Sequence, residues 1–227
     1  MFAIKKYIVY FPLFCLLNIS VTGVAKKEPF YALLSIAYPY IQQTEKFNFA
    51  LLALNFCLSI IFISTIIRLV HEQLIISNYV LTRVNKNKVF TVNVLRTLKS
   101  MSVVFLIKVF CDIILGQLQG CVNLKEAILI WSSLYLTLLI WVMCIYLMLW
   151  FHLSVKWTYF YICLLVIAMQ YLSAHISVCS LFIVGSGSIE SNPAMWLSIK
   201  ALTAFILAFF YLALTKKYEH INVKNDI

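Results

Sequence analysis

The sequence predicts an all-α, polytopic membrane protein with six transmembrane helices and with both termini in the cytoplasm. Of its 227 residues, 63% are hydrophobic and only 11% are charged, whereas soluble domains carry about 25% charged residues. Its apolar stretches are long enough to cross a hydrocarbon core, which takes roughly 20 helical residues. Lysine and arginine gather in alternate connections between these stretches, a pattern that orients membrane proteins.

The composition leaves no room for a separate soluble domain. Five glycines and four prolines are too few for long flexible linkers, so we expect one transmembrane domain over residues 1–227. The net charge of +10 is divided among short connections. Nucleic-acid binding would need a basic face on a folded domain, so the lipid bilayer is an expected partner and nucleic acid is not.

The apolar runs place the predicted spans at residues 7–25, 48–67, 101–121, 128–149, 158–184 and 196–214. The first run has features of a signal peptide, because Lys5 and Lys6 precede it and Gly23-Val24-Ala25 resembles a cleavage site. It is longer than a usual signal core and five more spans follow. An uncleaved first helix is therefore favoured.

The orientation follows from counting basic residues in the connections. With the N-terminus inside, the outer segments hold Lys26, Lys27, Lys46, Lys125 and Lys200. Lys108 falls inside a span. The inner segments hold twelve basic residues: Lys5, Lys6, Arg68, Arg83, Lys86, Lys88, Arg96, Lys99, Lys156, Lys216, Lys217 and Lys224.

The fifth run, 158–184, is too long for a simple crossing, since one helix of this length would reach about 40 Å. Its outer half contains small and polar residues such as Ser173 and His175. Non-helical backbone at this depth is tolerated only inside protein or beside a cavity. A break near 172–178 and a strongly tilted single helix both remain open.

The cytoplasmic connection 68–100 is the longest patterned segment outside the spans. Arg68 and Glu72 are one helical turn apart, the stretch after them has a broad apolar side, and 85–88 has the composition of a turn. A second amphipathic piece leads into the third span. These pieces are predicted either to lie on anionic lipid or to dock a cytosolic partner.

The stretch from Glu72 to Lys88 is similar to an element in the membrane subunits of type-2 ABC exporters. There, the helix after the second span has an acidic residue near its start, runs through a basic turn and re-enters the membrane. The six-span topology and the segment Asn192-Pro193-Ala-Met-Trp196 before the last span also resemble this family. The resemblance implies an ATPase-coupling surface formed by Glu72, Tyr79, Arg83, Lys86 and Lys88.

The resemblance also implies partners: a second permease subunit, forming a homo- or heterodimer, and a cytosolic ABC ATPase that holds ATP and Mg. The chain has no GxxxxGK[ST] phosphate loop, so we expect a permease subunit without enzyme activity or cofactor of its own. Small permeases of this kind export peptides or give immunity to bacteriocins. The preference for Ile, Asn and Lys suggests an AT-rich bacterial genome and therefore the bacterial cytoplasmic membrane.

Charged residues within a span usually face protein or water, because they are costly in lipid. Lys108 and Asp112 are one turn apart in the third span and can pair with each other. Gly116 and Gly120 follow at a spacing that permits close helix approach, although Gly120 is equally explained as a helix cap. The pair is predicted to be a bridge at a subunit interface, with a proton or substrate path as the alternative.

No catalytic or metal site is predicted. The four histidines lie at the edges of spans without an HExxH or paired-carboxylate spacing, and the seven cysteines are expected to be small buried apolar residues. Two alternatives to the exporter subunit remain. One is a membrane-embedded binding subunit of a vitamin-type uptake system, and the other is a non-transporting membrane anchor.

Overall fold

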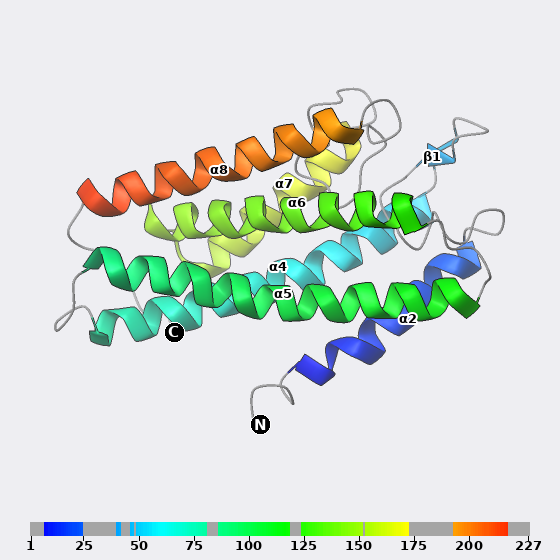
Figure 1. Ribbon diagram of the computed structural model, residues 1–227, viewed down its shortest axis with the longest axis horizontal. Helices are drawn as coiled ribbons and strands as arrows, with labels where there is room; N and C mark the ends of the chain where they lie inside the picture. The colour runs from blue at the N-terminus through cyan, green and yellow to red at the C-terminus, as the bar shows by residue number, and fades with distance from the viewer. Residues whose placement is uncertain are drawn as a thin grey trace.

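The computed structural model describes residues 7–24, 40–41, 46–47, 49–80, 86–118, 124–151, 153–172 and 193–217. These residues are almost entirely helical. A two-residue strand pair, β1 (Tyr40–Ile41) and β2 (Lys46–Phe47), is antiparallel, with Tyr40 opposite Phe47. The helices (Figure 1) are α2 (Tyr10–Val24), α4 (Phe49–Val80), α5 (Lys86–Leu118), α6 (Leu124–Trp150), α7 (Val155–Leu172) and α8 (Pro193–Lys217).

Successive helices run in opposite directions along a single bundle (Figure 1). Helix α6 lies at its centre and packs against α4, α5, α7 and α8, whereas α2 lies at one edge against α4 and α5. The core has large side chains at its middle, including Trp141, Tyr146 and Phe62, all of them almost completely buried. An alternating bundle of this kind is the arrangement that six membrane crossings would require.

Four of these helices are long and apolar enough to cross a membrane, namely α4, α6, α7 and α8. The apolar part of α2, Tyr10–Ser20, is shorter, and α5 carries the Lys108–Asp112 ion pair. The all-helical fold and four membrane-compatible helices are therefore established. Six crossings and cytoplasmic termini remain predictions.

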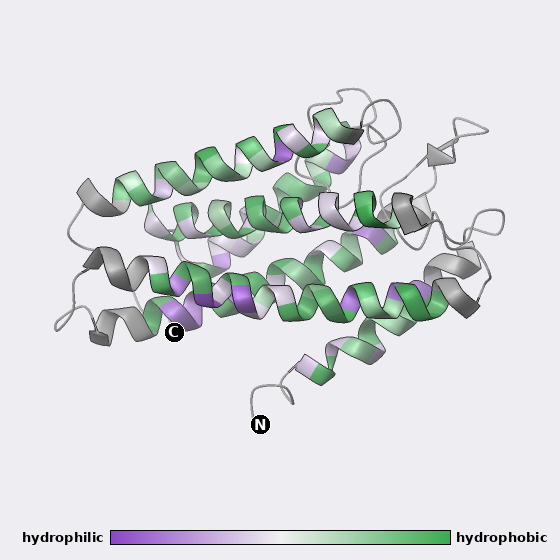
Figure 2. Ribbon diagram, in the orientation of Figure 1, coloured by the Kyte–Doolittle hydropathy of each residue, from purple (hydrophilic) through white to green (hydrophobic). Residues whose placement is uncertain are grey.

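The bundle has polar groups inside and apolar groups outside. Lys108, Asp112 and Lys200 are at most 2% exposed, whereas Phe205 and Phe209 on α8 are 69% and 67% exposed. The outer faces of α2 and α7 also expose large apolar side chains, and Figure 2 shows the hydrophobic colouring along the outer helices. Large exposed apolar surfaces are rare on soluble monomers, so these faces fit a lipid environment.

Helices α4 and α5 are longer than the spans predicted for them. Helix α4 continues past residue 67 to Val80, and α5 begins at Lys86, inside the 85–88 stretch that is predicted to be a turn. The sequence has no glycine or proline in 49–80 or 86–115 to interrupt either helix. The described parts of 68–100 are thus extensions of two long helices, not separate interfacial pieces. The Asn93 side-chain amide joins them by donating to the Gln73 carbonyl at 3.4 Å.

Helix α7 begins at a capping contact and is described as far as Leu172. The Ser154 hydroxyl accepts a hydrogen bond from the backbone N–H of Trp157 at 3.4 Å, which is an N-cap contact. The helix ends at Leu172, and α8 begins at Pro193, a residue suited to the first helical position. The predicted break at 172–178 otherwise lies outside the described residues.

Candidate functional site

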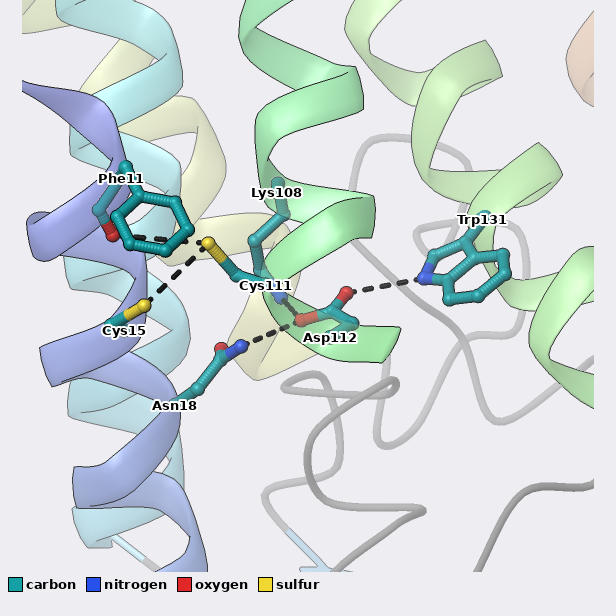
Figure 3. Close-up of polar contacts among 7 residues, drawn as sticks. All are labelled: Phe11, Cys15, Asn18, Lys108, Cys111, Asp112 and Trp131. Atoms are coloured by element: carbon teal, nitrogen blue, oxygen red, sulfur yellow. Dashed lines mark hydrogen bonds and ion pairs between the residues drawn. The ribbon is translucent and has the colours of Figure 1, made fainter. Parts of the chain in front are cut away.

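The carboxylate of Asp112 is the centre of a buried polar cluster that joins three helices. Its Oδ1 accepts hydrogen bonds from the Lys108 ammonium and, at 2.7 Å, from the Asn18 side-chain amide. Its Oδ2 accepts the Trp131 indole N–H at 3.1 Å. Figure 3 shows the Asn18 and Trp131 side chains reaching Asp112 from opposite sides. We call Asn18, Lys108, Asp112 and Trp131 the Asp112 cluster.

Each member of the Asp112 cluster is positioned by its own helix. Lys108 and Asp112 are one turn apart on α5, so their ion pair forms locally. Asn18 comes from α2 and Trp131 comes from α6, and both reach the carboxylate through helix packing. The carboxylate therefore connects α2, α5 and α6 at a single point.

The Asp112 cluster is buried within one chain. Lys108, Asp112 and Asn18 are at most 2% exposed, so the ion pair is already covered within this chain, and the bridge at a subunit interface stays a prediction. A buried carboxylate with a lysine partner and two further donors is well compensated. The Asp112 cluster thus holds three helices together, and its Asn18 Oδ1 atom is an acceptor without a donor among the described residues.

A second polar cluster involves Lys200, which is counted with the outer segments in the sequence analysis although it falls within the predicted span 196–214. The structure places it within the apolar stretch Ala194–Leu214 of α8, fully buried. Its ammonium donates to the hydroxyls of Ser133 and Thr137 on α6, at 2.8 and 2.9 Å. We call Ser133, Thr137 and Lys200 the Lys200 cluster.

The two clusters lie on opposite sides of α6 and at the same end of the bundle. Trp131 and Ser133 are two residues apart, which turns the helix by about 200°. Asp112 and Lys200 are each about 10 Å along the axis from the ends of their helices, at Leu118 and Pro193. Buried charges of both signs thus lie at one level, on the two flanks of the central helix.

The predicted ATPase-coupling residues are distributed over the other end of α4 and α5. Glu72 forms an exposed ion pair with Arg68 at 3.0 Å. Tyr79 lies in the last turn of α4, and Lys86 and Lys88 lie in the first turn of α5. Arg83 is outside the described residues. Of the predicted packing glycines, Gly116 lies near the end of α5 and Gly120 is also outside the described residues.

Sequence reasoning missed the residues that complete both clusters. Asn18 lies within an apolar run and Trp131 lies where an aromatic belt is expected, so neither residue stands out as a partner of a charged group. The available signal was a polar group on an apolar span, because such a group usually binds a partner inside the protein. Lys200 could have been found from its position after Trp196, because an aromatic belt residue places the following turns inside the membrane.

The described residues contain no group of three or more His, Cys, Asp and Glu side chains that could hold a metal ion. The contacts of the Asp112 and Lys200 clusters provide hydrogen bonding and charge compensation. Comparison of the chain with models of known protein families, with characterised proteins and with solved structures finds no match.

Proposed function

We propose that this chain is the membrane-spanning subunit of an ATP-driven ABC exporter in a bacterial cytoplasmic membrane. In this proposal six helices cross the bilayer with both termini in the cytoplasm, the subunit dimerises, and a separate ABC ATPase supplies ATP hydrolysis. The substrate class is a peptide or another amphipathic molecule. The observation that carries the proposal is the α4–α5 hairpin, which is longer than the bilayer is thick.

The length of the hairpin can be divided at its charged residues. Arg68 on α4 and Lys99 on α5 are both exposed, and charged side chains of this kind mark the edge of the hydrocarbon core. From Arg68 to the end of α4 is about 20 Å, and from the start of α5 to Lys99 is also about 20 Å. The remaining 49–67 and 100–118 each cover about 28 Å, close to one hydrocarbon thickness.

The projecting part of the hairpin suits a coupling role. Asn93 and Gln73 connect its two helices, so a force on its tip would be transmitted to both spans. Helix α5 begins with Lys86 and Lys88, and Arg83 precedes them in the sequence; in this proposal these three basic residues bind acidic groups of a cytosolic protein. Helix α5 leads from this tip directly to Asp112, and Figure 2 shows hydrophilic segments of α4 and α5 toward this end. The likeness to type-2 exporter subunits supports the same assignment.

The orientation with the hairpin in the cytoplasm is supported by the basic residues. Since Lys200 is buried in α8, the outer connections retain only Lys26, Lys27, Lys46 and Lys125, against twelve basic residues on the proposed inner side. A green fluorescent protein fused after residue 227 should fluoresce, because this protein folds in the cytoplasm. An alkaline phosphatase fusion at the same position should be inactive; the reverse result would overturn the proposed orientation.

The main experiment is purification of the full-length tagged chain from its native membranes in mild detergent. We expect an ABC ATPase, identified by its phosphate-loop sequence, to co-purify in a stoichiometric amount. The charge reversal R83E/K86E/K88E should remove it. The matched control K216E/K217E, at the end of α8, should keep it.

Absence of an ATPase from the unaltered complex would overturn the exporter assignment, as would equal loss with both charge reversals. A small molecule retained through purification in place of an ATPase would instead indicate a binding subunit of an uptake system. A chain that purifies with neither would indicate a membrane anchor.

A further inference from the structure

Two cysteine thiols from distant parts of the chain meet at the seam between α2 and α5. The Sγ atoms of Cys15 and Cys111 are 3.7 Å apart, and the Cys111 thiol also reaches the Phe11 carbonyl at 3.8 Å. Figure 3 shows the two sulfur atoms pointing toward each other beside Asp112. The two cysteines are not part of the Asp112 cluster, and the proposed transport function assigns them no role.

The geometry points to a redox-active dithiol: Cys15 and Cys111 form a reversible disulfide that links α2 to α5, with a lipid-soluble quinone as the oxidant. A disulfide requires its sulfur atoms at about 2.05 Å, so closure needs an approach of under about 2 Å from the present contact. Side-chain rotation and a small shift of α2, which lies at the edge of the bundle, can supply this approach.

A quinone is proposed because the contact between Cys15 and Cys111 lies close to the apolar outer surface of the bundle. Cys15 is only partly buried, and the neighbouring side chains Leu16 and Phe110 are 65% and 56% exposed on the apolar outer surface. An oxidant therefore reaches the pair from lipid and not from water. In the reaction the two S–H bonds break, one Sγ–Sγ bond forms, and two electrons and two protons pass to the quinone, which becomes a hydroquinone.

The disulfide would act directly on the Asp112 cluster. Asn18 follows Cys15 by about one helical turn, and Asp112 is adjacent to Cys111 in the chain. Oxidation would therefore hold the Asn18 amide against the Asp112 carboxylate, whereas the reduced pair would leave α2 held by hydrogen bonds and packing. This inference needs no ATPase and is independent of the exporter proposal.

The test uses the full-length reduced protein in lipid nanodiscs and counts free thiols by denaturing maleimide labelling and intact mass. Decylubiquinone, a fully substituted quinone with no free ring position for thiol addition, should remove two labelled thiols. Peptide mapping should then show a Cys15–Cys111 link that disappears on reduction. The water-soluble oxidant glutathione disulfide should react much more slowly.

The variants C15A and C111A should each lose no thiol on quinone treatment, while C163A, a half-buried cysteine on α7, should lose two like the unaltered protein. Quinone oxidation that persists in C15A or C111A would overturn the assignment of the pair. Failure of the unaltered protein to form the link even with copper phenanthroline would overturn the geometry. Equal rates with glutathione disulfide would overturn access from lipid.

Discussion

The Asp112 cluster and the Lys200 cluster lie at the same level on the two flanks of α6, yet they hold their charges differently. Asp112 forms an ion pair with Lys108 and accepts two further donors, so its contacts draw three helices together. Lys200 donates to two hydroxyls that come from a single helix. The first cluster therefore connects one edge of the bundle to its centre, and the second joins α8 to α6.

The difference shows which charge the fold depends on. Removing one member of a buried ion pair leaves its partner's charge buried without compensation. This costs more stability than removing a buried charge and leaving only neutral partners behind. Removal of Asp112 leaves Lys108 charged, whereas removal of Lys200 leaves the neutral hydroxyls of Ser133 and Thr137. The comparison can be tested by unfolding the protein with sodium dodecyl sulfate in mixed micelles, with helix content followed by circular dichroism.

The largest effect is expected for Asp112→Leu. The substitution leaves the Lys108 ammonium buried without its carboxylate, so the free energy of unfolding should fall by about 3–5 kcal/mol. The double variant K108M/D112L removes both charges and should recover most of this loss. If the double variant is as unstable as D112L, the ion pair is not the reason for the loss.

A smaller effect is expected for Trp131→Phe, which keeps an aromatic ring but removes the N–H that binds Asp112 Oδ2. The free energy of unfolding should fall by about 1–2 kcal/mol, the range for one partly buried hydrogen bond to a charged group in a membrane bundle. The control Trp157→Phe alters an exposed side chain and should change little. Equal losses in the two variants would show that the indole bond contributes nothing specific.

The smallest effect is expected for Lys200→Met, which keeps much of the side-chain volume and removes the charge. The free energy of unfolding should stay within about 1 kcal/mol of the unaltered value, because the lost hydrogen bonds are offset by removal of the desolvation cost of a buried ammonium. The Thr137 hydroxyl also retains its hydrogen bond to the Ser133 carbonyl at 3.0 Å.

The double variant S133A/T137V keeps the Lys200 ammonium and removes two of its acceptors. It should therefore lower the free energy of unfolding by more than Lys200→Met does. If Lys200→Met is the more damaging of the two, Lys200 serves the fold as Asp112 does, and the contrast between the clusters fails.

The amino-acid sequence by itself determined the class of the protein and its local contacts. Helices follow from apolar runs without glycine or proline, and the Lys108–Asp112 ion pair follows from the spacing of one turn within a single helix. The same local rules cannot say where a long helix leaves the membrane, so the continuation of α4 to Val80 and of α5 from Lys86 was missed.

Tertiary structure alone decided which helix faces meet. The contacts of Asp112 with Asn18, of Cys15 with Cys111 and of Lys200 with Ser133 each join residues 67 or more positions apart in the chain. In a bundle with apolar surfaces on all sides, hydrophobic periodicity does not distinguish the face that meets protein from the face that meets lipid. Close packing and the need to compensate buried charge make that distinction, and both arise only once the helices are assembled.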